Sequence, residues 1–247
     1  MTERLGFDEH LAAIETEASR LGAVAAGALD HRVPTCPEWS GRDLVEHVAS
    51  TFTFWTHQLA AADPSERHDP PPYDGGSTAP DPVEWLDASS SILLESLAQL
   101  GPDQPSWNWS GANFTSGWVA RRMALEVAVH RYDGERAAGE ASPVATELAV
   151  DGIDERLEVH LRADVPEFPS ASLGGPLCLA CSDADAAWVV EVGSGKLRVR
   201  CGTGPARAVL KGPASALFLF SWNRLGPDSL ELTGDASVGR AWATLPV

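Results

Sequence analysis

A carboxylate and an imidazole on the buried stripe of a predicted helix restrict the fold of this chain more than any other feature. In the segment RRMALEVAVHRYD, residues 121–133, Glu126 and His130 lie four residues apart. They share an i, i+3, i+4, i+7 stripe with Met123 and Val127, which is the face that a helix buries. Burying either polar group is costly unless it has a strong partner. The fold must therefore bring polar partners into a helical core at this point.

That partner can be a metal ion. Side chains at i and i+4 lie about 5–6 Å apart at Cβ, so both can reach one ion. A third residue of ligand type, His47, lies in GRDLVEHVAS, another segment with helical periodicity. Two imidazoles and one carboxylate suit zinc or a similar divalent ion and leave a coordination position open for chemistry. The alternative is an ion pair at the surface or a buried hydrogen-bonded pair without metal.

Two charged neighbours on the same helix can interact with these residues. Asp133 follows His130 by three residues, so it can orient the imidazole from behind or simply lie near the helix end. Arg122 precedes Glu126 by four residues and can pair with it. Ligand-type residues on the inner faces of two bundle helices favour the metal, because bundle cores are where such sites are built.

Helical periodicity covers the first two thirds of the chain. Pro34 and Pro37 interrupt it, and Ser40 is a good N-cap for the helix that carries His47. A polar segment rich in Pro and Gly, residues 63–81, separates the second helix from the third. The predicted helices cover about 7–28, 41–61, 82–100, 116–139 and 145–162.

After Ser170 the pattern becomes β-rich. The runs PLCLACSD, AAWVVEVG, KLRVRCG and ARAVLKG are short and separated by Gly, Asp and Ser. A helical segment at 213–225, a strand in SLELTGD and a helix at 236–245 follow. The sequence therefore predicts a helical bundle at 1–166 and a small α+β domain at 167–247.

Composition excludes several classes of partner. The net charge is −17, and no basic patch is visible, so nucleic acid and anionic membranes are not expected partners. The amphipathic start of the chain does not have the apolar core of a secretory signal. Four cysteines in 247 residues do not make a disulfide scaffold, and we expect a reduced cytoplasmic protein. Cys178 and Cys181, three apart in a predicted strand, point to opposite faces and are interpreted as structural.

Three segments resemble the mycothiol-dependent maleylpyruvate isomerase family. VPTCPEWSGRDLVEHVA, residues 33–49, is similar to its Pro-x-Cys-Pro-x-Trp turn, which enters a helix ending in a metal-binding His. RRMALEVAVHRYDG, residues 121–134, is similar to its second signature, with Tyr132 where the family commonly has Trp. GPASALFLFSWNRLGPDSLELTGDASVGRAW, residues 212–242, resembles its C-terminal domain.

The resemblance implies a fold and a chemistry. The fold is a DinB-like four-helix bundle that holds a divalent metal, usually zinc, through His47, Glu126 and His130, with a small sterol-carrier-like α+β domain behind it. The chemistry is isomerisation of a cis double bond: the thiol mycothiol adds to the alkene, the single bond rotates and the thiol leaves. An anionic substrate or thiol needs a nearby cation, and the candidates are Arg224 and Arg122, each of which can also be a structural ion pair.

We therefore expect a metal-dependent isomerase or S-transferase that uses mycothiol or a similar thiol on a small anionic substrate. Its partners would be the small-molecule thiol and substrate, without nucleic acid or membrane. The alternative is a metal-stabilised binding or regulatory module that keeps the scaffold without turnover. Carriage of an apolar ligand by the C-terminal domain is a third interpretation, and it rests on fold analogy alone.

Overall fold

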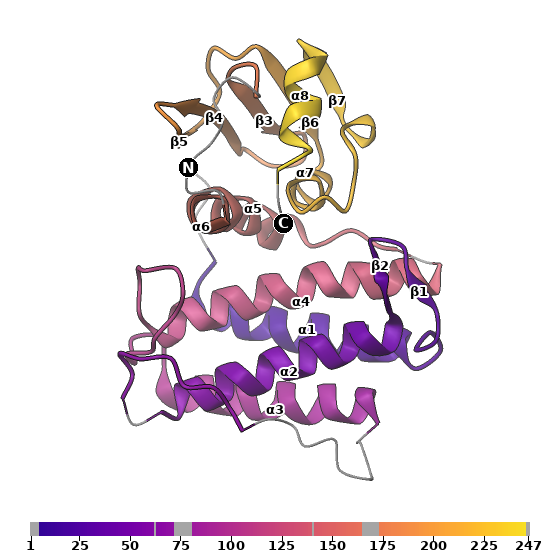
Figure 1. Ribbon diagram of the computed structural model, residues 1–247, viewed down its shortest axis with the longest axis vertical. Helices are drawn as coiled ribbons and strands as arrows, with labels where there is room; N and C mark the ends of the chain where they lie inside the picture. The colour runs from indigo at the N-terminus through magenta and orange to yellow at the C-terminus, as the bar shows by residue number, and fades with distance from the viewer. Residues whose placement is uncertain (1–4, 62, 72–80, 140, 165–172, 246–247) are drawn as a thin grey trace. The chain divides into compact units, whose positions relative to one another are not determined.

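A computed structural model describes residues 5–61, 63–71, 81–139, 141–164 and 173–245. The chain forms two compact units that divide between Ser142 and Pro143. The first unit is helical, and the second combines helices with a sheet (Figure 1). Among the described residues, no helix is both long and apolar enough to cross a membrane.

The first unit is a four-helix bundle, as predicted. Its helices are α1 (Phe7–Ala25), α2 (Gly41–Leu59), α3 (Pro82–Leu100) and α4 (Ser116–Ala138) (Figure 1). Helix α1 packs against α3 and α4, and α2 packs against the same two helices. The predicted apolar stripes form the core, in which side chains from all four helices are at most 1% exposed: Ile14, Leu21, Leu44, Val48, Phe52, Leu93, Leu97, Met123 and Val127.

A small hairpin precedes α2, where the sequence indicated an irregular break. Strands β1 (Arg32–Val33) and β2 (Cys36–Ser40) pair in antiparallel fashion. The hairpin ends at the N-cap of α2, as predicted, because Ser40 accepts a hydrogen bond from the backbone N–H of Asp43 and the Asp43 carboxylate accepts one from Ser40. Because the segment contains prolines, its sequence does not show the pattern from which strands are predicted.

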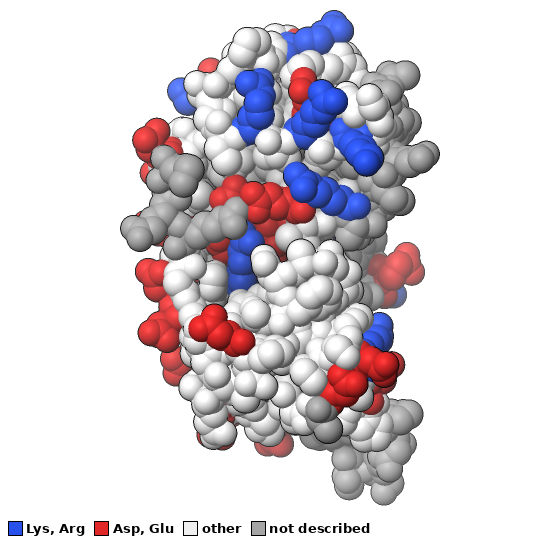
Figure 2. All heavy atoms as spheres, turned by 90° about the vertical axis from the view of Figure 1, so that its left-hand side faces the viewer, with Lys and Arg blue, Asp and Glu red and all other residues white. Residues whose placement is uncertain are grey.

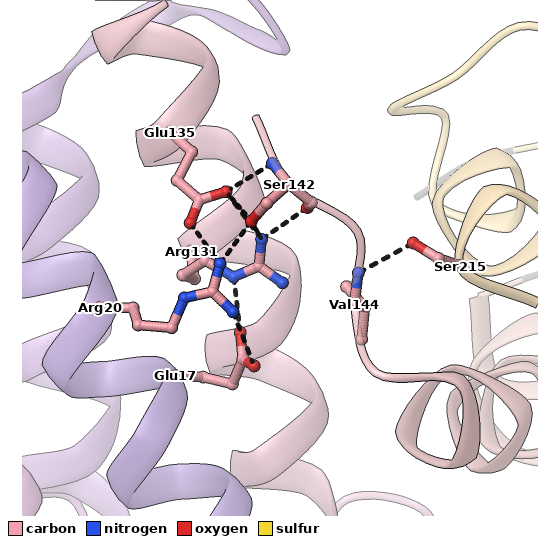
Figure 3. A network of polar contacts seen from close by, with 7 residues as sticks. All are labelled: Glu17, Arg20, Arg131, Glu135, Ser142, Val144 and Ser215. Atoms are coloured by element: carbon pink, nitrogen blue, oxygen red, sulfur yellow. Dashed lines mark hydrogen bonds and ion pairs between the residues drawn. The ribbon is translucent and has the colours of Figure 1, made fainter. Parts of the chain in front are cut away.

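One face of α4 holds a buried ionic network (Figure 3). The Arg131 side chain is fully buried and donates to Glu17 at 2.6 Å, to Glu135 at 2.8 Å and to the Ser142 carbonyl at 2.7 Å. Arg20 donates to Glu135 at 2.7 Å and to the Ser142 hydroxyl. Burial of these charges is tolerated because each carboxylate has a guanidinium partner at hydrogen-bond distance.

The network makes stability depend on pH through Glu135. Burial alone would raise the pKa of Glu135, but hydrogen bonds from Ser142 and the charge of Arg131 outweigh it and lower the pKa. A carboxyl with a depressed pKa stabilises the fold above its unfolded pKa of about 4.3, and this stability is lost as the pH falls through the folded value. Glu135→Gln should therefore lower the free energy of unfolding at pH 7. Its difference from wild type should shrink as the pH falls below about 4.3. Urea unfolding at several pH values measures this, with the exposed Glu95→Gln as control. A difference independent of pH would contradict the assignment.

The second unit begins with α5 (Thr146–Glu155), a π-helical turn (Arg156–His160) and α6 (Leu161–Asp164). These three elements replace the single helix predicted at 145–162. The remaining elements are β3 (Leu177–Cys181), β4 (Ala187–Gly193), β5 (Lys196–Cys201), β6 (Ala208–Gly212), α7 (Ala214–Ser221), a 3₁₀ turn (Pro227–Ser229), β7 (Glu231–Gly234) and α8 (Ala236–Trp242).

The strands form one mixed sheet in the order β5-β4-β3-β6-β7. The β3–β6 pair is parallel, and the other neighbours are antiparallel. Helix α7 contacts β3 and β6, and α8 contacts β6 and β7. This arrangement confirms the predicted α+β class of the C-terminal region, and every strand of the sheet comes from after residue 170.

The predicted domain boundary at 166/167 lies outside the described residues. By packing, the described chain divides earlier, after Ser142, so that α5 groups with the sheet. The reason is that α5 packs against α7, and the backbone N–H of Val144 donates to Ser215 on α7 at 2.9 Å (Figure 3). Helical periodicity shows that a segment has an apolar face, but it does not show which element covers that face.

Lys and Arg side chains gather on the face of the second unit seen in Figure 2. In the sequence, residues 192–227 contain six Lys or Arg and no Asp or Glu, a local excess that the net charge of −17 conceals. Lys196, Arg198 and Arg200 are exposed on β5, which is an edge strand of the sheet. Cations on an edge strand oppose pairing with the strands of other chains.

Cys178 and Cys181 of this unit have the features of structural residues. All four cysteines of the chain are free thiols, and Cys178 on β3 is buried. Burial raises the pKa of the Cys178 thiol. Burial and the charge of Asp183 raise the pKa of Cys181 to about 12. Both thiols therefore stay protonated at neutral pH, a state that makes poor metal ligands and poor nucleophiles.

Candidate metal centre

The three predicted ligand residues converge between α2 and α4. His47 comes from α2, whereas Glu126 and His130 lie one turn apart on α4. Their ligand atoms all lie within 4.8 Å of one another. Glu126 Oε1 lies 3.1 Å from Nε2 of His47 and 3.3 Å from Nε2 of His130. The structure thus brings together the three side chains that the sequence analysis selected, one on α2 and two on α4.

These separations fit a divalent ion. Ligands about 2.0–2.2 Å from a tetrahedral ion stand about 3.3–3.6 Å from one another, close to the separations of 3.1 Å and 3.3 Å between Glu126 Oε1 and the two imidazoles. The donor set of two imidazoles and one carboxylate is also one that zinc accepts with a coordination position left open. Among the described residues, His47, Glu126 and His130 form the one group of three or more side chains able to hold a metal in this way.

The protonation states of the cluster follow from its hydrogen bonds. Burial alone would raise the pKa of Glu126, but hydrogen bonds from His130 and His47 and the charge of Arg122 hold it well below its usual value. Burial would lower the pKa of His130, but hydrogen bonds to Asp133 and Glu126 raise it to about 9. In the metal-free protein His130 is therefore protonated at neutral pH, and a metal ion must displace that proton.

Each charged neighbour has a defined contact. Arg122, 3% exposed, donates to Glu126 Oε2 at 3.0 Å, which leaves Oε1 directed at the two imidazoles. Asp133, fully buried, lies 3.0 Å from His130 Nδ1. Because a carboxylate accepts, Nδ1 is the donor, and Nε2 is the nitrogen that faces the cluster. Arg122 thus pairs with Glu126, and Asp133 hydrogen-bonds to His130 from behind. A role of Arg122 toward a substrate stays a prediction.

Solvent reaches the cluster from the side of α2. The His47 side chain is 36% exposed, compared with 19% for Glu126 and 9% for His130. An ion held by these residues would be accessible to a small molecule, because one of its ligands lies at the protein surface. A purely structural zinc site is usually closed by four protein ligands.

Two residues of the hairpin, which had no role in the sequence analysis, contact the cluster or the carboxylate behind it. Thr35 donates to Asp133, and Trp39 packs against His47 and His130. The signal that could have found them is the Pro-x-Cys-Pro-x-Trp turn, which directly precedes the helix of His47. Periodicity alone assigns such a turn to a connection.

Arg224, the other predicted cation, lies just after α7 in the second compact unit. Its side chain donates to the carbonyl of Trp222 at 2.9 Å, and its backbone N–H donates to the carbonyl of Leu219 at 2.8 Å. Its role toward a substrate stays a prediction.

Comparisons with known proteins identify the fold and the family of the helical unit. No curated protein matches the chain. Two crystal structures of mycothiol-dependent maleylpyruvate isomerase, one of them a mutant, share its fold with TM-scores of 0.61 and 0.60 at 14% and 12% identity. Each match covers 94% of this chain and 95% of the other. The family model described as the mycothiol maleylpyruvate isomerase N-terminal domain matches residues 11–134, a range that contains all three candidate ligands. The chain therefore belongs to the mycothiol maleylpyruvate isomerase N-terminal domain family.

Proposed function

We propose that the chain is a metal-dependent enzyme that uses mycothiol or a similar low-molecular-weight thiol for isomerisation or S-transfer on a small anionic substrate. The observation that carries this proposal is the convergence of His47, Glu126 and His130 on one accessible point. The fold shared with mycothiol-dependent maleylpyruvate isomerase supports the thiol and the reaction class. Zinc is the proposed metal, because the donor set is the one that zinc accepts.

The residues of the site would have separate roles. His47, Glu126 and His130 would hold the ion, Arg122 pairs with the outer oxygen of Glu126, and Asp133 keeps His130 directed at the site. A bound divalent ion would supply a Lewis acid that lowers the pKa of a thiol and polarises a substrate carbonyl.

In isomerisation, the thiolate sulfur forms a bond to one alkene carbon, and the π electrons move toward the conjugated carbonyl. After rotation about the new single bond, the C–S bond breaks and the thiolate returns. No oxidant or reductant is needed. In S-transfer the thiol would instead stay on the product. An accessible open site serves both outcomes, and Arg122 or Arg224 would attract an anionic substrate.

A non-catalytic binding or regulatory module on the same scaffold is the alternative. It would hold the same ion but would need neither thiol nor turnover. The accessible edge at His47 favours the enzyme, because a metal used only for stability gains nothing from exposure to solvent.

The test uses the full chain loaded with Zn²⁺ or Co²⁺. We expect loss of the cis isomer of maleylpyruvate, or of another cis-alkenoic acid conjugated to a carbonyl, only when mycothiol and metal are both present. We also expect mycothiol to change the visible spectrum of the Co²⁺ protein, because sulfur would enter its coordination sphere. Stoichiometric Co²⁺ binding with a spectrum that no thiol changes, together with no turnover, would support the non-catalytic module.

A further inference from the structure

The β1–β2 hairpin, residues 32–40, contacts the metal centre at two points. Thr35 reaches it through Asp133, and Trp39 lies against both imidazoles. We propose that this hairpin sets the orientation of both histidine ligands before the ion binds, with Thr35 and Trp39 as positioning residues. The inference rests on the proposed metal site and adds the element that organises it.

The first contact is a chain of hydrogen bonds from the hairpin to His130. The Thr35 hydroxyl donates to Asp133 Oδ1 at 2.6 Å, and Asp133 Oδ2 lies 3.0 Å from His130 Nδ1. The Cys36 thiol also approaches Oδ2, at 3.9 Å. Asp133 is fully buried, so its two oxygens depend on such donors. The Thr35 hydroxyl thus fixes the carboxylate rotamer that directs Oδ2 at the imidazole.

This chain determines which nitrogen of His130 is available. Because the carboxylate accepts from Nδ1–H, the proton that an ion displaces from His130 is the one on Nε2, the nitrogen 3.3 Å from Glu126. Without the Thr35 hydroxyl, we expect the Asp133 carboxylate to be held less firmly in the rotamer that accepts from His130 Nδ1. The Thr35 side chain therefore acts on metal affinity without contacting the ion.

The second contact is the indole of Trp39. Its ring centroid lies 4.8 Å from that of His47 and 5.9 Å from that of His130, with interplanar angles of 43° and 36°. The two imidazoles themselves lie 4.9 Å apart at 76°. One indole thus packs on both ligand rings, restricts their rotation and shields them from water on that side. The hairpin holds this indole in place because it ends in the N-cap of α2, seven residues before His47.

The experiment distinguishes the effect of the Thr35 hydroxyl on metal affinity from the effect of the side-chain shape. Thr35→Val keeps the branched shape and removes the hydroxyl, whereas Thr35→Ser keeps the hydroxyl and removes a methyl group. Co²⁺ affinity is measured by chelator competition. We expect Thr35→Val to weaken binding by about tenfold, the lower end of what changes behind metal ligands produce, and Thr35→Ser to stay within about twofold of wild type. Thr53→Val is the matched control, because the Thr53 hydroxyl bonds to the carbonyl of Ala49 within α2.

A second readout reports the orientation directly. In the Zn²⁺-loaded wild type, long-range ¹H–¹⁵N spectra should show the proton of His130 on Nδ1, and Thr35→Val should weaken or broaden that signal. Trp39→Leu should lower Co²⁺ affinity by roughly two- to tenfold, and Trp39→Phe, which keeps a ring, by less.

The outcomes distinguish this inference from the proposed function. Wild-type protein that binds neither Co²⁺ nor Zn²⁺ would refute the metal site itself. Wild-type protein that binds, with Thr35→Val equal to it, would overturn the role of the hairpin alone. Equal losses for Thr35→Ser and Thr35→Val would overturn it as well, because the hydroxyl would then not be the cause.

Discussion

His47→Ala is expected to abolish thiol-dependent turnover and leave the bundle folded. A three-ligand site that loses one imidazole should lose more metal affinity than the about 10- to 100-fold that changes behind the ligands produce. The His47 side chain is 36% exposed, so its removal opens little core volume. The variant does not leave the Glu126 carboxylate without a charged partner, because Glu126 keeps its contacts with His130 and Arg122.

Two measurements test this expectation together. Turnover is compared with that of His57→Ala, an exposed histidine on the same helix, which should match wild type. Thermal unfolding is followed with and without a chelator. If the metal served folding instead, its binding free energy would be folding free energy, and both His47→Ala and chelated wild type would lose their cooperative transitions. A large fall in melting temperature on chelation would therefore favour the structural interpretation.

The sequence predicted the bundle because its signals are local. Apolar stripes at helical spacing, with Ser40 as an N-cap, mark α2 to within two residues of its end, and α3 agrees at both ends. The same reasoning joined residues 145–162 into one helix, where the structure has α5, a π-helical turn and α6. The π-helical turn has no sequence signal of its own, because it differs from an α-helix in backbone hydrogen bonding and not in side-chain pattern.

The metal centre was predictable in part for a similar reason. Glu126 and His130 share one helix, so their spacing places them on one face. That His47 meets them depends on how α2 packs against α4, and here the family resemblance supplied what periodicity did not. The roles of Thr35 and Trp39 were not predicted, because a hairpin that contains prolines has neither helical nor strand periodicity. The contacts of these residues with α4 also form only in the folded chain.

Arg131 gave no sequence signal either, and its replacement should cause the largest loss of stability. Arg131→Met leaves Glu17 and Glu135 buried without the guanidinium that joins them, and breaking a buried pair in this way costs about 3–5 kcal/mol. Urea unfolding measures the loss. Asp69→Asn in the exposed Arg67–Asp69 pair is the control, with at most about 1 kcal/mol expected.

A double variant tests whether the loss comes from the stranded carboxylates or from the removal of Arg131 packing. Glu17→Leu added to Arg131→Met removes one of the two buried charges, so it should recover part of the lost stability, although Glu17→Leu alone destabilises wild type. Glu135 would keep its contact with Arg20, so the recovered protein should remain a single cooperative unit. Additive losses in the double variant would show instead that the stranded charge of Glu17 is not the source of the loss, since a mutation that relieves an uncompensated charge cannot add to the cost of creating it.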